Sequence, residues 1–276
     1  ECIRRTDALV KKYHDGAHPL IRIWAGASVP WATTEHLYRA IAAYSESAGI
    51  SYSMHILETE EDNLYTMKHF GKPVIDTLAS LDVLSDKLLA VHCVNLKNEE
   101  IGTLAGFGVN AVYCPMANTY LGSGIPPMAL MHRKGVNITM GTDGAASNNS
   151  SDMIESMKMG LLLQKGATRD PAALKAQDML DFTTINAAKA ACRDDLGSIE
   201  EGKLADMFVF NPAYLRSSPN FDTLTTLMYN SSQENIETTI VNGRIVYDKG
   251  SFACGLEEAA IVEEVEREMR AFMSRR

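Results

Sequence analysis

The strongest constraint on the fold is a repeated alternation between short apolar stretches and segments with helical periodicity. Five apolar stretches, bounded by turn residues, span residues 20–27, 50–54, 88–94, 110–114 and 136–142. They recur at intervals of about 20 to 40 residues, which is typical of βαβ units and therefore predicts a parallel sheet. Because most of these stretches are apolar at consecutive positions, the sheet should be buried on both faces.

The segments between the stretches carry helix start and stop signals. Thr33 or Thr34 can cap a helix that runs to residue 48, and Gly49 stops it. The other expected helices span residues 5–13, 63–70, 74–81, 97–107, 127–134, 151–164, 171–182 and 184–192. The sequence fits a (β/α)8 barrel or a doubly wound sheet. It contains no glycine-rich phosphate-binding loop, which weighs against a nucleotide-binding version.

The character of the sequence changes after residue 196. Three further strands are expected, over residues 204–211, 237–241 and 244–247. The pair Asn242-Gly243 between the last two is the strongest hairpin signal in the chain. We therefore expect an α/β part, a small β module and a charged C-terminal helix, with boundaries at 1–196, 197–256 and 257–276.

Composition excludes several kinds of partner. The net charge of −9 leaves no basic surplus to neutralise phosphates, so a nucleic-acid partner is not expected. No apolar run reaches the ~18 residues that a membrane span needs. The five cysteines form no CxxC pair, and we expect reduced, mostly buried thiols in a cytoplasmic protein. The acidic stretches 58–62 and 257–268 read as solvated helix faces.

Four polar residues stand at or just after the ends of expected strands: His55, Glu58, His92 and Asp143. In a barrel these ends converge on one mouth. Two imidazoles and a carboxylate suit zinc, which lowers the pKa of a bound water to roughly 7. Glu58 would lie beside the ion and could shuttle protons.

Each of the four also has a purely structural interpretation. A single histidine at a strand end is commonly a hydrogen-bonded structural residue, Asp143 before Gly144 fits turn chemistry, and Glu58 fits a helix N-terminus. Only the joint placement of the four favours chemistry. The other histidines are read as surface residues: His14, His18, His36, His69 and His132.

Five motifs carry a resemblance to a known family. They are HILETE at 55–60, LAVHCVNL at 89–96, VYCPMANTYLGSGIPPM at 112–128, GTDGAASNN at 141–149 and GSIEEGKLADMFVFN at 197–211. In this order they resemble the metal-dependent amidohydrolase superfamily. The similar branch is the one that holds S-adenosylhomocysteine/methylthioadenosine deaminases, guanine-type deaminases and triazine hydrolases.

The resemblance implies an α/β fold with the C-terminal strands of a (β/α)8 barrel, followed by part of a composite β-sandwich. It implies that His55 and Asp143 bind one divalent metal, zinc or alternatively iron(II). His92 would contact the substrate, Glu58 would protonate a ring nitrogen, and Asp143 would take the proton of the attacking water. Residues 118–123 and the loop near Trp31 would help to line the pocket.

The implied reaction is hydrolysis of a C–N bond in a small nitrogen heterocycle such as a purine, a pterin or an adenosine thioether. GTDGAASNN and CPMAN are most similar to the subgroup that acts on adenosine-like thioethers. A dechlorinating triazine-type hydrolase and a guanine deaminase stay open as alternatives. The resemblance also implies a homodimer.

One departure from the family pattern changes these expectations. Relatives supply two more metal ligands from a His-x-His at the end of the first barrel strand, and no His-x-His occurs in this sequence. Counting back from Asp143 as strand eight makes residues 20–27 strand four, so we expect this chain to be the C-terminal part of a longer enzyme, with the N-terminal part separate or missing. Alone, it should hold zinc weakly or not at all.

Two further interpretations remain. The chain could be a non-catalytic remnant that serves in binding or assembly. It could also belong with the phosphotriesterase-like or dihydroorotase-like hydrolases, which usually carry a lysine between two metals on strand four. Residues 20–27 contain no lysine, so a mononuclear site is favoured.

Overall fold

The computed structural model describes residues 1–14 and 20–275. The chain divides into two compact units, Glu1–Ser198 and Ile199–Arg276. None of the described helices is long and apolar enough to cross a membrane.

The first unit is built on a parallel sheet of five strands, ordered β1-β2-β3-β4-β5. The strands are β1 (Ala25–Gly26), β2 (Tyr52–Ile56), β3 (Leu88–His92), β4 (Asn110–Tyr113) and β5 (Asn137–Met140). Strands that follow each other in sequence are neighbours throughout, without the reversal of winding that defines a doubly wound sheet. The expected α/β class and parallel sheet are confirmed. Closure into a barrel is not shown by these strands.

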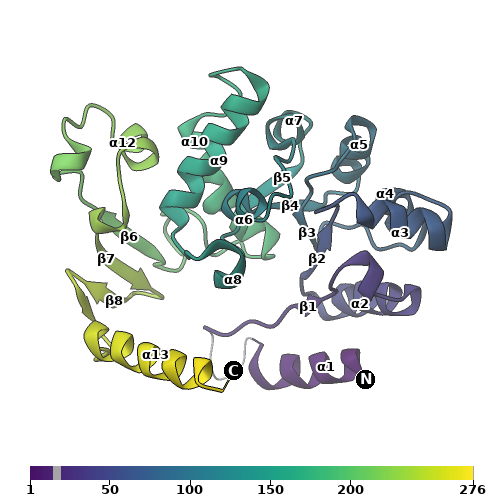
Figure 1. The fold of residues 1–276 in the computed structure, drawn as a ribbon, viewed down its shortest axis with the longest axis horizontal. Coiled ribbons are helices and arrows are strands. Elements are labelled where there is room, and N and C mark those ends of the chain that lie inside the picture. The colour runs from purple at the N-terminus through teal and green to yellow at the C-terminus, as the bar shows by residue number, and fades with distance from the viewer. Residues whose placement is uncertain (15–19, 276) are drawn as a thin grey trace. The chain divides into compact units, whose positions relative to one another are not determined.

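Helices precede, separate and follow the strands of this sheet. They are α1 (Cys2–Tyr13), α2 (Glu35–Ala48), α3 (Glu61–Phe70), α4 (Val74–Ser80), α5 (Asn98–Gly106), α6 (Pro115–Tyr120), α7 (Met128–Arg133), α8 (Ala145–Asn148), α9 (Met153–Thr168), α10 (Ala176–Thr183) and α11 (Ile185–Ala190). Figure 1 shows α2, α3, α4 and α5 on the same side of the strands. A run of βαβ crossovers of one hand gives this arrangement when every strand is added to the same edge.

Two short helices of the first unit, α6 and α8, were not expected from the sequence. Pro115 reads as a strand breaker, but it occupies the first position of α6, where its fixed φ and missing N–H suit a helix start. The helix α8 is a single turn after Gly144. Both lie directly after strands that lead to the candidate site.

The strands bury their side chains in two different ways. Leu88, Leu89 and Ala90 are consecutive in β3 and all are buried, as expected for a strand covered on both faces. In β2 the buried Tyr52, Met54 and Ile56 alternate with half-buried residues. His55 belongs to this half-buried face of β2.

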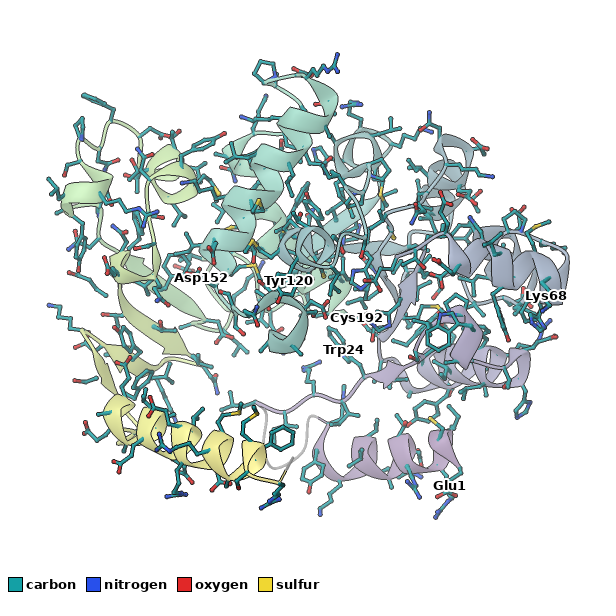
Figure 2. All side chains as sticks on the ribbon, viewed as in Figure 1. Glu1, Trp24, Lys68, Tyr120, Asp152 and Cys192 are labelled. Atoms are coloured by element: carbon teal, nitrogen blue, oxygen red, sulfur yellow. The ribbon has the colours of Figure 1, made fainter. Side chains whose placement is uncertain are left out.

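The prediction of a first strand over residues 20–27 is largely wrong. Only Ala25–Gly26 of residues 20–27 pairs with β2, through Ala25 to Tyr52 and Gly26 to Ser53. Leu20 is 64% exposed and Trp24 is 38% exposed (Trp24 is labelled in Figure 2). The apolar run gives the local strand signal, but a strand needs a hydrogen-bonding neighbour over its whole length.

Helix capping follows the sequence closely. The Thr34 side chain accepts a hydrogen bond from the Leu37 N–H at 3.3 Å, and Gly49 ends α2 with a left-handed φ of 66°. At the start of α9, Asp152 (labelled in Figure 2) accepts hydrogen bonds from the N–H groups of Ile154 at 2.8 Å and Glu155 at 3.1 Å. Asp152 thereby satisfies two of the N–H groups that have no partner within the helix.

Replacing Asp152 with alanine should lower the free energy of unfolding by about 1 kcal/mol, because two helix N–H groups lose their acceptor. Urea denaturation should show a lower midpoint with an unchanged slope. Asp152→Asn retains an accepting oxygen and should lose much less stability. Equal midpoints for the alanine variant and the parent would contradict a capping role.

The second unit contains one antiparallel sheet, ordered β6-β7-β8-β9. Its elements are β6 (Met207–Phe210), α12 (Thr223–Tyr229), β7 (Ile236–Val241), β8 (Arg244–Asp248), β9 (Ser251–Phe252) and α13 (Glu258–Met273). The expected hairpin is confirmed, with left-handed φ values at Asn242 and Gly243 as a tight two-residue turn requires. The described residues of this unit form no second sheet, so the β-sandwich stays a prediction.

Some expectations for single residues need correction. His14 is half-buried and its Nδ1 accepts the Ile23 N–H at 3.0 Å, so it is not a free surface residue. Only two of the five cysteines, Cys93 and Cys114, are buried; the other three are exposed because they lie in terminal or loop segments. His18 and Arg276 lie outside the described residues.

Candidate active site

The parallel register of β2 and β3 brings two of the predicted residues together. Ile56 pairs with His92, so His55 and His92 differ by only one residue in the register of these two adjacent strands. Their rings are stacked, with centroids 5.3 Å apart and planes inclined by 22°. Two imidazoles from separate segments therefore share one place at the C-terminal end of the sheet.

His92 is held by an amide from α6. Its side chain is 1% exposed, and Nδ1 lies 2.7 Å from Oδ1 of Asn118, which is also buried. With the amide oxygen of Asn118 as the acceptor, Nδ1 of His92 is the donor of this hydrogen bond. In the neutral imidazole, Nε2 is then left with a lone pair.

Glu58 faces the free nitrogen of His92. The Oε2 atom of Glu58 lies 3.6 Å from Nε2 of His92, and Ser123 Oγ donates a hydrogen bond to Oε1 at 3.2 Å. The Glu58 side chain is 21% exposed, so it can be reached from solvent. One carboxylate oxygen is thus fixed, and the other is directed toward the imidazole.

Asn118 organises the loop after α6 as well as His92. Its backbone oxygen accepts the Ser123 N–H at 2.9 Å, and Ser123 in turn binds Glu58. The resemblance placed residues 118–123 at the pocket, and the structure brings Asn118 and Ser123 into contact with two of the candidate residues. Trp31 lies in a short 3-10 helix and is 59% exposed.

Asp143 is less closely joined to the other three. It is exposed, it has a left-handed φ of 61°, and its Oδ1 accepts the Gly144 N–H at 2.7 Å. Burial, with smaller contributions from the charges of Asp143 and Glu58, raises the pKa of the nearby Cys114 thiol to about 12. The structure therefore brings both His55 and Glu58 into contact with His92, and the charges of Asp143 and Glu58 both act on the Cys114 thiol.

The backbone is strained where the strands end. Leu57, His92, Cys93 and Asp143 all have left-handed φ values, between 51° and 76°. Such conformations cost about 1 kcal/mol or more for residues other than glycine, and they concentrate at functional sites. Each of these residues is a candidate or the direct neighbour of one.

A metal ion fits part of this arrangement. The Nδ1 atom of His55 is buried and has no hydrogen-bond partner among the described residues, which leaves a lone pair available for a ligand bond. Within the part of the chain that the structure describes, no group of three or more His, Cys, Asp or Glu side chains is arranged to hold a metal. His55 and Asp143 would thus be a partial ligand set.

One residue of the site was misjudged from the sequence. The acidic stretch 58–62 reads as a solvated helix face, yet Asp62 is only 2% exposed. Burial raises the pKa of Asp62 to about 6, and hydrogen bonds from the backbone N–H groups of Glu58 and Leu57 oppose that rise. No local signal separates Asp62 from Glu60 and Glu61, because only the packing of α3 decides which acid turns inward.

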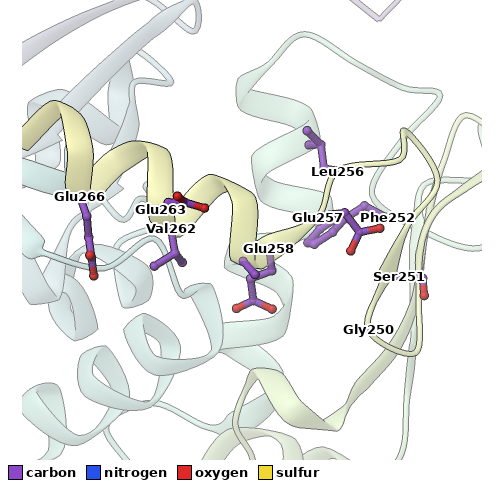
Figure 3. Close-up of a pocket in the computed structure, with 10 residues that line it drawn as sticks. Gly250, Ser251, Phe252, Leu256, Glu257, Glu258, Val262, Glu263 and Glu266 are labelled. Atoms are coloured by element: carbon purple, nitrogen blue, oxygen red, sulfur yellow. The ribbon is translucent and has the colours of Figure 1, made fainter.

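A separate hollow in the second unit does not offer comparable chemistry. It lies between β9 and the start of α13 and is lined by Phe252, Leu256, Val262 and several glutamates (Figure 3). No histidine or cysteine lines it, and none of the four candidate residues does. The side chains suited to catalysis therefore lie at the strand ends of the first unit.

Comparison with known proteins identifies the family. The sequence profile of the amidohydrolase family matches residues 1–246. The chain belongs to the amidohydrolase family. The resemblance drawn from the five motifs is thus confirmed.

Named relatives of this amidohydrolase chain are deaminases. A 5'-deoxyadenosine deaminase of Methanothermobacter thermautotrophicus is 34% identical over 261 residues, which cover 95% of this chain and 61% of that protein. A 5-methylthioadenosine/S-adenosylhomocysteine deaminase of Caldicellulosiruptor saccharolyticus is 30% identical, with 95% and 61% covered. The amidohydrolase chain thus spans about three fifths of the length of these relatives.

Solved structures agree with this assignment. An adenosine deaminase from Xanthomonas campestris with bound zinc superposes with a TM-score of 0.93 at 26% identity, over 98% of this amidohydrolase chain and 61% of that one. An atrazine chlorohydrolase from Arthrobacter aurescens complexed with zinc gives a TM-score of 0.90 at 22% identity, over 96% and 59%. The second likeness is one of fold alone.

Proposed function

We propose that the whole protein is a metal-dependent aminohydrolase that removes the amino group of an adenosine-type nucleoside modified at its 5' position. The observation that carries this proposal is the contact between His55, His92 and Glu58 at adjacent strand ends of an amidohydrolase chain. The named activities of relatives that are 30% and 34% identical supply the substrate class.

Glu58 is suited to move a proton. Ser123 fixes Oε1, which leaves Oε2 free to carry a proton toward a ring nitrogen of the substrate. His92 stands 3.6 Å away and is held by Asn118 with its Nε2 lone pair directed at the same space. In this proposal His92 orients the group that is attacked, and Asp143 accepts the proton of the attacking water.

His55 and Asp143 would hold the metal, together with ligands that the described residues do not provide. When bound, zinc would supply a water acidic enough to be present as hydroxide near neutral pH. The unpaired Nδ1 of His55 supports this assignment. Zinc is favoured over iron(II) because the adenosine deaminase that shares the fold at 26% identity contains bound zinc.

We further propose that the five strands are part of a closed (β/α)8 barrel in the whole protein. The sequential strand order and the likeness to amidohydrolase structures support this proposal. Residues 197–256 would then form part of a composite β-sandwich, followed by the C-terminal helix. A homodimer and a cytoplasmic location stay predictions.

The proposal is tested by metal analysis and by ammonia release from the whole protein. We expect about one zinc ion per chain and release of ammonia from 5'-deoxyadenosine and 5'-methylthioadenosine. Two further substrates test the alternative activities. Ammonia release from guanine would indicate a guanine deaminase, and chloride release from atrazine would indicate a dechlorinating triazine-type hydrolase. A normally folded protein that contains no metal and releases no ammonia would instead indicate the non-catalytic remnant.

A further inference from the structure

The peptide groups around Glu58 are held in an unusual way. Glu58 follows Leu57, whose left-handed φ of 51° turns the chain away from β2 toward α3. At such a turn the backbone N–H and C=O groups leave the sheet and need other partners. Two side chains from different elements supply them.

Asp62 holds the N–H side of the turn. It lies in the first turn of α3 and its side chain is buried; burial raises the pKa of its carboxyl, and hydrogen bonding from the backbone N–H groups of Leu57 and Glu58 lowers that pKa in part. Hydrogen bonds to an ionised acceptor are roughly twice as strong as those between neutral groups. Burying this carboxylate is unfavourable, as its raised pKa of about 6 indicates, and these hydrogen bonds offset part of that cost.

Asn95 holds the C=O side of the same turn. It lies in the loop after β3, and its Nδ2 donates to the backbone oxygens of Glu58 (3.1 Å) and Leu57 (3.4 Å). The Asn95 backbone N–H also donates to the Leu57 oxygen at 2.9 Å. The peptide groups of Leu57 and Glu58 are thus fixed from both sides.

We propose that Asp62 and Asn95 act as positioning residues that clamp the Leu57–Glu58 turn and so hold the Glu58 carboxylate against His92. Neither residue needs to touch the substrate. The effect on rate rests on the proposed function, whereas the clamp itself does not. A displacement of about 1 Å in a catalytic group can lower a rate by about 100-fold, so a clamp of this kind matters even without substrate contact.

The first arm of the test measures the clamp without reference to activity. In Asp62→Asn, hydrogen exchange at the amides of Leu57 and Glu58 should be at least about 10-fold faster than in the parent, because the acceptor of both N–H groups is weakened. Glu100→Gln is the matched control: Glu100 is also a buried carboxylate that accepts a backbone N–H, that of Lys97 at 2.8 Å, but it lies on α5. The control should leave exchange at Leu57 and Glu58 unchanged. Unchanged exchange in Asp62→Asn would overturn the clamp.

The second arm measures catalysis of the zinc-loaded whole protein. Asp62→Asn should lower kcat about 10- to 100-fold with little change in KM, and Glu100→Gln should not. In a Glu58→Gln background the Asp62→Asn change should have almost no further effect, because there is no longer a proton donor to position. Full additivity of the two changes would overturn the positioning role.

Asn95→Ala provides an independent check if Asp62→Asn folds poorly. Hydrogen exchange should become faster at the peptide groups whose oxygens Asn95 binds, namely those of Leu57 and Glu58. The value of kcat should fall, and in a Glu58→Gln background the change should again have almost no further effect. Accelerated exchange with an unchanged kcat would also overturn the positioning role. If the parent protein releases no ammonia from any purine nucleoside, the proposed function fails, and the exchange arm still decides whether the clamp exists.

Discussion

Replacing Asp143 with asparagine should lower kcat for deamination by about 10³- to 10⁴-fold and should also reduce the zinc content of the purified protein. The amide cannot accept the proton of the attacking water, and it is a poorer metal ligand than a carboxylate. Ammonia release and metal analysis on the same preparation measure both effects. The size of the effect follows from the two roles proposed for one side chain.

Asp152→Asn is the control for this variant. It removes a negative charge from the segment that follows the same strand but keeps the oxygen that caps α9. It should retain parental kcat and zinc. An Asp143→Asn protein that keeps both its zinc and its rate would show that Asp143 serves only the turn, where it accepts the Gly144 N–H.

Replacing Glu58 with glutamine should lower kcat by about 10²- to 10⁴-fold while the zinc content stays at the parental level. The glutamine oxygen can still accept from Ser123, so the local structure is kept, but the side chain can no longer donate and recover a proton at the reacting nitrogen. Steady-state kinetics should show the loss in kcat rather than in KM.

Glu60→Gln is the matched control, since Glu60 is exposed and lies two residues further along the chain. The two active-site variants separate the proposed roles: Asp143→Asn loses metal and rate, whereas Glu58→Gln loses rate alone. A Glu58→Gln protein with reduced zinc would reassign Glu58 to the metal. An unchanged rate would remove Glu58 from the mechanism.

Part of this fold can be predicted from local sequence patterns. The strand and helix alternation, the Thr34 cap, the Gly49 stop and the Asn242-Gly243 hairpin all depend on a few adjacent residues, and the structure contains each of them. The convergence of His55 and His92 could also be predicted, because parallel neighbours end on the same side of a sheet. Such features need no knowledge of distant contacts.

Other features were decided only by tertiary contacts. Residues 20–24 have a strand-like composition, but they pair with no strand of the described sheet, and the Ile23 N–H is bound by the His14 side chain instead. Asp62 and Glu61 look alike in sequence, and the packing of α3 buries only Asp62. The Asn118 amide is hydrogen-bonded to the imidazole of His92, 26 residues away in the sequence. No local sequence pattern predicts a contact over that separation.

The sequence by itself thus determined most of the secondary structures, the order in which they follow, and which strand ends carry imidazole and carboxylate groups. The tertiary structure decided which side chains hold those groups in place, namely Asn118, Ser123, Asp62 and Asn95. The physical reason is that backbone propensity and capping act over one or two turns of chain, whereas hydrogen bonds between side chains depend on segments that only the folded sheet brings together.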